Sequence, residues 1–195
     1  MLSETGQIAK QALVLMLVPI NDRWKLPLGY FLVNGLNGLQ KSQIVKECLK
    51  KVSELDIVVA SITFAPSNKT MAKELGCNLD LANPISFFVC EDRKIFVNYD
   101  ACHVIKLIRN ALGELKILNI ENSNQQIRWS YIEQLHELQE KQGLHLGNKL
   151  RQAHVEFHKQ KMKVRLATQV FSDSVAVALE HCNNILKYKQ FEGCQ

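Results

Sequence analysis

The sequence predicts an α/β first half followed by an all-α second half. Up to about residue 112, apolar segments of strand length alternate with segments whose apolar residues recur at helical spacing. From Asn124 onward the chain has no proline and almost no alternating pattern. We therefore predict two domains, residues 1–112 and 113–195, with their junction in the polar stretch 113–124.

Composition is typical of an intracellular globular protein. The 195 residues are 47% hydrophobic and 22% charged, with a net charge of +5, which permits a polyanionic partner without requiring one. Six cysteines form no CxxC pair and no regular spacing, so we expect reduced thiols and neither a disulfide framework nor a zinc site. The longest apolar run, residues 12–20, is too short for a bilayer and lacks a signal cleavage site, so no membrane association is expected.

Three strands and a helix are expected in the first 64 residues. Ala12–Val18 is a continuous apolar run, as in a strand covered on both faces. Leu28–Val33 and Ile57–Phe64 are the next strands. Between these two, Ser42 is expected to cap a helix that ends near Leu55. The apolar stripe of this helix consists of Ile44, Val45, Cys48, Leu49 and Val52.

A short helix and two short strands complete the α/β pattern. The helix covers about Lys69 to Leu75 and ends at Gly76, which suits the left-handed residue that closes many helices. The strands are Phe87–Cys90 and Lys94–Tyr99.

Asp100 follows the last strand and opens a helix with an unusual polar side. Asp100, His103 and Lys106 recur every third residue, and Asn110 lies one turn further on. The opposite side is formed by Val104, Ile105, Ile108 and Leu112. Two interpretations stay open: a helix N-cap followed by a solvated face, or an acid and an imidazole delivered to a catalytic site.

The second half predicts three helices and a concentration of positive charge. Ile127, Tyr131, Leu135 and Leu138 space out a helix that stops near Gly143, and further helices cover about 148–166 and 167–186. Seven basic residues lie from position 141 to 165, against the single acid Glu156: Lys141, Lys149, Arg151, Lys159, Lys161, Lys163 and Arg165. Such a cluster recognises phosphates, or it forms a solvated helix face.

His154 and His158 lie one helical turn apart within this basic segment. The glutamate between them is not adjacent to His154, so the HExxH metalloprotease signature fails. We expect both histidines to be solvated, and we assign no metal ligand in the chain.

Several segments in order along the chain resemble the P-element transposase family, including its THAP-domain relatives. They are Trp24–Phe31, Asp100–Asn110, Ile127–Ile132, Asn148–Leu150, and Lys161–Gln169 with Ser172 and Ser174–Ala176. The resemblance implies an RNase H-like domain, partial here, interrupted by a helical GTP-binding insertion. It also implies cut-and-paste DNA transposition in the nucleus, with GTP and Mg²⁺ as cofactors, and transposon-end DNA and further copies of the chain as partners.

The resemblance further implies that the three catalytic carboxylates are missing. The first would precede Ala12 and the third would follow Gln195. The second would stand where Thr63 and Phe64 run directly into Ala65 and Pro66. We therefore name no catalytic residue, and the resemblance places Asp100 and His103 at the sheet-to-insertion junction near the former active site.

The implied nucleotide site is partial as well. By resemblance, Lys149, Lys163, Val164 and Ser172 line the nucleotide pocket, whereas the family's base-reading aspartates would follow Gln195. The chain has no GxxxxGK[ST] loop, so an ordinary GTPase is not expected.

Three functions are carried forward. The first is a fragment or domesticated derivative of a transposase without activity of its own. The second is a nucleotide- or DNA-binding interaction module that uses the basic helix Lys149–Arg165. The third is a small metal-dependent hydrolase built around Asp92, Asp100 and His103. Without the first central strand of an RNase H-like sheet, the chain is expected to expose apolar surface from Leu13 to Val18 and to aggregate.

Overall fold

The computed structural model describes residues 8–79, 82–121, 125–144, 146 and 148–194. The chain divides into two compact units, Met1–Tyr99 and Asp100–Gln195, and each has a buried core of its own. The helix that follows Asp100 therefore packs with the second unit. The predicted domain boundary between residues 112 and 113 stays a prediction. The predicted junction, 113–124, ends in residues 122–124, which lie outside the described ranges.

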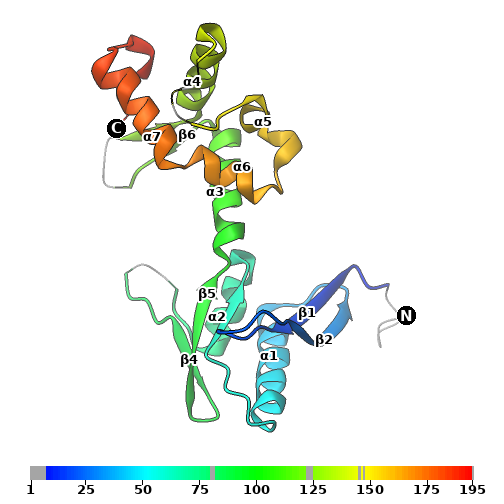
Figure 1. Ribbon diagram of the computed structural model, residues 1–195. Helices are drawn as coiled ribbons and strands as arrows, with labels where there is room; N and C mark the ends of the chain where they lie inside the picture. Colours follow the sequence, from blue (N-terminus) through cyan, green and yellow to red (C-terminus); the bar gives the residue numbers. More distant parts are fainter. Residues whose placement is uncertain (1–7, 80–81, 122–124, 145, 147, 195) are drawn as a thin grey trace. The chain divides into compact units, whose positions relative to one another are not determined.

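Unit 1 carries the larger sheets and unit 2 is mainly helical (Figure 1). The elements of unit 1 are β1 (Gln11–Leu17), β2 (Leu26–Val33), α1 (Gly38–Ser53), β3 (Ser61–Phe64), η1 (Pro66–Asn68), α2 (Lys69–Leu75), β4 (Phe87–Cys90) and β5 (Arg93–Tyr99). The elements of unit 2 are α3 (Ala101–Leu115), β6 (Ile117–Asn119), β7 (Gln126–Arg128), α4 (Trp129–Gln142), α5 (Gln152–Val155), η2 (Phe157–Gln160), α6 (Val164–Val170), α7 (Asp173–Glu180), η3 (His181–Ile185) and η4 (Lys189–Phe191).

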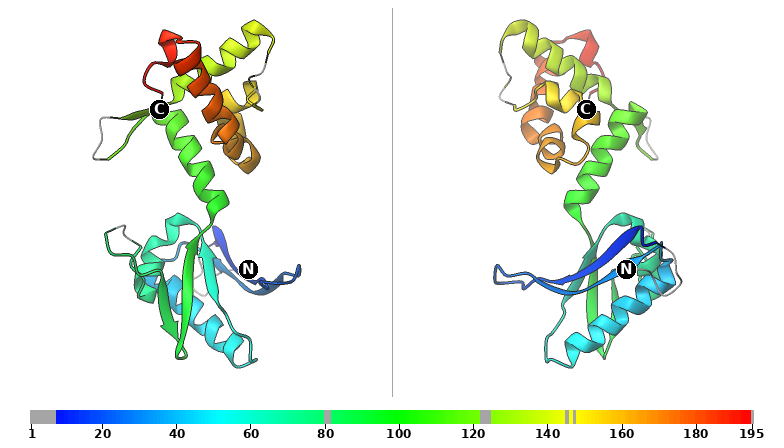
Figure 2. Two further views of the ribbon diagram at one scale, coloured as in Figure 1. Left: turned by 60° about the vertical axis from the view of Figure 1, so that its left-hand side comes forward. Right: turned by 90° about the vertical axis from the view of Figure 1, so that its right-hand side faces the viewer.

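Two sheets and helices α1 and α2 build unit 1 (Figure 2). β1 and β2 form an antiparallel ribbon, and β5 lies between β3, its parallel neighbour, and β4, its antiparallel neighbour. Val45 and Leu49 of α1 share one core with Phe88, Ile95 and Val97 of the second sheet. Leu15 of β1 and Ile62 of β3 pack against the same core, which places both sheets on α1 and α2.

Strand β1 is covered on one face only, so the prediction of a strand covered on both faces is wrong. Leu13, Leu15 and Leu17 are partly buried, whereas Val14 and Met16 are about half exposed, at 50% and 51%. The side chains of a strand alternate between its two faces, and one face of this two-stranded ribbon rests on the core. Within the described residues, nothing covers the other face enough to bury Val14 or Met16.

Helix α1 begins five residues earlier than predicted, because Asn37 caps it and not Ser42. The Asn37 side chain accepts a hydrogen bond from the Gln40 amide at 2.8 Å, and the Gln40 side chain accepts one from the Asn37 amide at 3.1 Å. This reciprocal capping box satisfies two amides that a helix leaves free at its start. Ser42 is not the cap, because it is buried inside the helix and its hydroxyl donates to the Leu39 carbonyl.

The remaining elements of unit 1 largely agree with the sequence. Val45, Leu49 and Val52 form the buried side of α1, and α2 ends at Gly76 with a φ of 103°. β4 and β5 lie where predicted, and β3 begins at Ser61, four residues later than expected.

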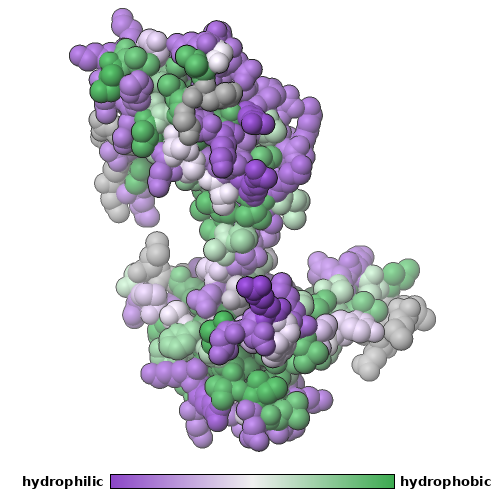
Figure 3. Space-filling view, in the orientation of Figure 1, coloured by the Kyte–Doolittle hydropathy of each residue, from purple (hydrophilic) through white to green (hydrophobic). Residues whose placement is uncertain are grey.

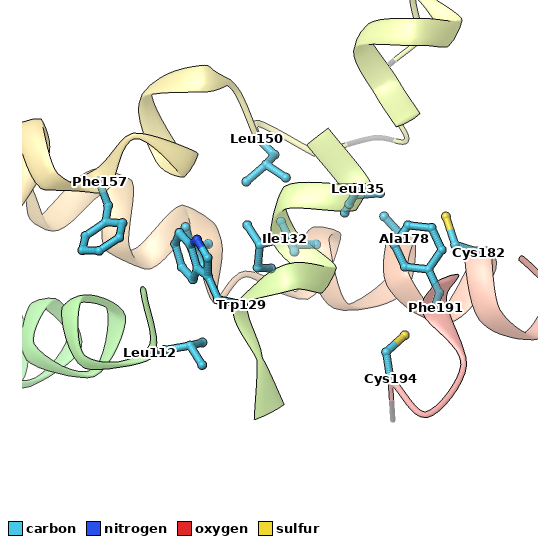
Figure 4. Packing of buried hydrophobic residues seen from close by; sticks show 12 residues of the cluster. Leu112, Trp129, Ile132, Leu135, Leu150, Phe157, Ala178, Cys182, Phe191 and Cys194 are labelled. Carbon is cyan, nitrogen blue, oxygen red and sulfur yellow. The ribbon is translucent and has the colours of Figure 1, made fainter. Parts of the chain in front are cut away.

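The core of unit 2 is assembled around helix α4. Trp129 lies against Phe157 with their ring centroids 5.3 Å apart, and Leu112 of α3 belongs to the same cluster (Figure 4). Helix α4 ends at Gly143, as predicted. Ile127 belongs to the β6–β7 hairpin and not to the helix, since it pairs with Leu118.

The long helices predicted for 148–166 and 167–186 are wrong. The first region contains α5, η2 and the start of α6, and the second is interrupted between α6 and α7. Side-chain hydrogen bonds hold the backbone out of one continuous helix here. The His154 ring accepts from the nearby Arg151 amide, and the Arg109 side chain, from a distant part of the chain, donates to the Gln160 and Lys161 carbonyls. The basic segment Lys149–Arg165 is therefore a series of short turns. In the described part of the chain, no helix combines the length and apolarity that crossing a bilayer requires.

Candidate nucleotide-binding site

A cavity of about 510 Å³ lies among α5, η2 and α6 in unit 2. It is lined by Lys149, Arg151, Ala153, His154, Gln160, Lys163, Arg165, Leu166 and Gln169. The turns that interrupt the predicted helix bring Lys149 and Lys163 to one cavity, although fourteen positions separate them in the sequence. Arg151 and Arg165 join them, so four cationic side chains line the same space.

Among the described residues no acid lines this cavity, and the seven basic residues of segment 141–165 fall into two groups. Lys141, Lys159 and Lys161 pair with Glu137, Glu156 and Glu114. The hydrogen bonds from Lys161 and Lys159 lower the pKa of Glu114 and Glu156. The second group is Lys149, Arg151, Lys163 and Arg165, none of which forms an ion pair within the described ranges. The cavity thus concentrates uncompensated positive charge.

His154 forms part of the cavity framework. It is only 2% exposed, so the expectation of a solvated histidine is wrong for this residue. Its Nδ1 accepts from the Arg151 amide at 3.0 Å, and its Nε2 lies 3.0 Å from Oε1 of Gln169. A neutral imidazole with its proton on Nε2 satisfies both contacts and ties α5 to α6. His158 is exposed as expected and lies against the Phe157 ring.

Val164 and Ser172 lie at opposite ends of α6. Val164 is the first residue of the helix, between Lys163 and Arg165. Ser172 follows the helix and lines a separate cavity of about 320 Å³. Its hydroxyl donates to the carbonyl of Gln169, whose side chain contacts His154. Among the four residues implied by the resemblance, the structure thus brings Lys149 and Lys163 together and places Ser172 at a neighbouring cavity.

Asp100 is the N-cap of α3. Its Oδ1 accepts from the Cys102 amide at 2.9 Å and from the His103 amide at 3.2 Å. Asp92 lies at the other end of β5, a seven-residue strand that spans roughly 20 Å. The hydrolase site built from Asp92, Asp100 and His103 is therefore not assembled. Across the described residues, no three His, Cys, Asp or Glu side chains are close enough to hold a metal ion.

Comparisons with known proteins match both units. A family model described as "TNP-like, RNase H N-terminal domain" matches residues 1–76, and one described as "TNP-like, GTP-binding insertion domain" matches residues 102–195. DNA transposase THAP9 of Homo sapiens is 31% identical to the chain over an alignment of 196 residues, gaps included, that covers 96% of the chain. The chain is related to the P-element transposases.

The fold agrees with this family. The Drosophila P element transposase strand transfer complex contains a chain that matches 95% of this one with a TM-score of 0.74 and 22% sequence identity. The match spans 42% of that chain, and the match to THAP9 spans 21% of the human protein. Both relatives are thus considerably longer than the segment they share with this sequence.

Two observations bear on the sites that the resemblance implied. The end of β3 carries no acid, since Phe64 is followed by Ala65 and Pro66. The cavity is also lined by Arg151, Gln160, Arg165 and Gln169, which the resemblance did not imply. The two arginines were visible only as members of the basic cluster, whereas nothing in the sequence pattern marked the two glutamines.

Proposed function

We propose that this relative of the P-element transposases binds a nucleoside triphosphate in unit 2, mainly through contacts of basic side chains with its phosphates. The observation that carries the proposal is a set of four cations, Lys149, Arg151, Lys163 and Arg165, around one cavity. Among the residues that the structure describes, these cations form no ion pair and no acid lines the cavity. Lysine and arginine bind phosphate oxygens most strongly where several converge on one polyanion. The volume of about 510 Å³ falls in the ordinary range of small-molecule sites.

GTP is the nucleotide that the matching insertion-domain family supports. The described lining residues offer cations for the phosphates, but none of them is a carboxylate that could accept from the guanine ring nitrogen and amino group. We therefore expect phosphate number to determine affinity more than base identity. GTP and ATP should bind with similar dissociation constants, and GMP should bind far more weakly.

Titration with GTP tests this proposal directly. Wild type should saturate, and Lys163→Ala should weaken binding about tenfold or more, because a charged hydrogen bond contributes about 1.5–3 kcal/mol. Lys141→Ala is the matched control, since Lys141 pairs with Glu137 and does not line the cavity. Absence of saturable binding, or equal weakening by both substitutions, would refute the proposal.

We further propose that the chain acts on DNA in the nucleus without cleaving it alone. THAP9 is named a DNA transposase and the matched structure is a strand transfer complex, which supports transposon-end DNA and further copies of the chain as partners. A partial RNase H-like domain followed by the helical insertion is supported by the two family models, which match residues 1–76 and 102–195.

The described residues do not fit the Mg²⁺ pair of such enzymes. Two-metal catalysis requires several carboxylates around ions about 4 Å apart. The end of β3 offers none, and Asp100 is engaged as a helix cap. The purified chain should show no nicking of supercoiled DNA with Mg²⁺ or Mn²⁺. Nicking that disappears in Asp100→Ala would contradict this expectation and restore the hydrolase hypothesis.

A further inference from the structure

One side of helix α3 holds the segment that leads into the cationic cavity. Arg109 is completely buried, at 0% exposure, and its Nη2 donates to the Gln160 carbonyl at 2.9 Å and to the Lys161 carbonyl at 3.2 Å. Its Nε donates to Oδ1 of Asn110 at 2.8 Å. The side-chain nitrogen Nδ2 of Asn110 in turn lies 3.4 Å from the Lys161 carbonyl oxygen.

Arg109 is unusual because its buried charge contacts no carboxylate in the described ranges. Burial lowers the pKa of this guanidinium, yet an arginine keeps its charge in proteins. Its compensation comes from the two backbone carbonyls and from the Phe157 ring, whose centroid is 5.9 Å away. The two carbonyls lie where η2 ends and a turn begins, and backbone acceptors at such ends need an outside donor. The Arg109 guanidinium therefore holds the backbone of residues 160 and 161 in place.

Two more contacts fasten the same segment to α3. The Phe157 ring packs on Gly113 so closely that a β-carbon at position 113 would collide with it. Lys161 forms an ion pair with Glu114. Residues 157–161 thus contact four residues of α3: Arg109, Asn110, Gly113 and Glu114. Lys163 follows two residues later, and Gln160 itself lines the cavity.

We propose that Arg109 is a positioning residue for the phosphate site, a role that rests on the proposed nucleotide binding. It holds the backbone at Gln160 and Lys161 and thereby directs Lys163 and Gln160 toward the cavity. Arg109 does not line the cavity and need not touch the nucleotide. Its loss should release the segment and lower affinity although all four lining cations remain.

The test uses the full chain with Arg109→Gln and Arg109→Lys. Limited trypsin digestion without nucleotide measures cleavage after Lys159, Lys161 and Lys163. We expect at least tenfold faster cleavage at these sites in Arg109→Gln. Arg109→Lys should give an intermediate rate, because one ammonium replaces a planar fork that serves two carbonyls. Val175→Ala, a buried change in α7, is the control for general destabilisation and should leave the relative rates at these sites unchanged.

Nucleotide titration of the same variants completes the experiment. The dissociation constant for GTP should rise at least fivefold in Arg109→Gln, recover in part in Arg109→Lys, and stay within twofold of wild type in Val175→Ala. Wild-type cleavage rates in a folded Arg109→Gln variant would overturn the positioning role, and if that variant does not fold, wild-type rates in Arg109→Lys would do so. If Arg109→Gln is cleaved faster but the wild-type chain binds no nucleotide, Arg109 still positions the segment and only the proposed nucleotide binding is refuted.

Discussion

Gly113 shows how one missing side chain organises unit 2. It lies on α3 beneath the Phe157 ring, in the same i, i+3, i+4 pattern that makes Arg109, Leu112 and Gly113 the buried side of the helix. The sequence predicted Ile108 in that stripe, but Ile108 is exposed and Arg109 is buried. Hydrophobicity alone points away from a buried arginine, because its compensating carbonyls lie more than fifty residues further along the chain.

Gly113→Ala separates packing from helix propensity. In an open helix, this change would stabilise the protein by about 1 kcal/mol. Here the new methyl group would collide with Phe157, so we expect a net destabilisation of about 1–3 kcal/mol in urea unfolding. Cys102→Ala, on the exposed side of the same helix, should change the stability by less than about 0.5 kcal/mol. A stabilised Gly113→Ala variant would show that the Phe157 contact is not close.

At the scale of helices and strands, caps and turns determine where the sequence pattern predicts an element's bounds correctly. Asp100 was recognisable as an N-cap because it directly follows a strand and precedes an apolar stripe. Asn37 was missed, although Asn37 and Gln40 have the spacing of a capping box. The turns between α5 and α6 were not predictable from spacing, because contacts of His154 with Gln169 and of Arg109 with distant carbonyls hold them. These turns form the cavity, although the sequence pattern of the segment predicts one continuous helix.

Asp100→Ala tests whether this carboxylate is structural. Loss of its two bonds to the α3 amides should lower stability by about 1 kcal/mol, as for other N-cap truncations. Asp100→Asn, which keeps an acceptor oxygen, should recover most of that loss in the same denaturant titration. GTP affinity should stay within twofold of wild type in both variants. Destabilisation by Asp100→Asn equal to that by Asp100→Ala would argue against the capping role.

At the scale of the whole molecule, the alternation of strands and helices in the first half and the helical second half followed from apolar periodicity. The partly exposed ribbon β1–β2 did not, since a continuous apolar run indicates a strand buried on both sides. Val14 and Tyr30 face each other across the ribbon, at 50% and 67% exposure. Apolar residues are visible on the surface of unit 1 in Figure 3. An apolar sheet face of this kind promotes association.

We therefore expect the protein to aggregate through the β1–β2 face. Val14→Glu combined with Tyr30→Lys places opposite charges on facing positions and should increase the monomeric fraction in light scattering, with stability changed by less than about 0.5 kcal/mol. Leu15→Lys is the contrasting change, because Leu15 packs against the core of unit 1, and it should unfold or strongly destabilise the chain. Equal aggregation of wild type and the charged pair would remove this face as the cause.

The central claim, a phosphate site made by Lys149 and Lys163 with Arg151 and Arg165, is tested most directly by lysine footprinting. The full chain is acylated with and without saturating GTP, and modification is quantified at each lysine by mass spectrometry. We predict that GTP protects Lys149 and Lys163 severalfold and leaves Lys141, Lys187 and Lys189 unchanged, since the latter three do not line the cavity. Protection of the latter three with Lys149 and Lys163 still reactive, or no protection at saturation, would contradict the account.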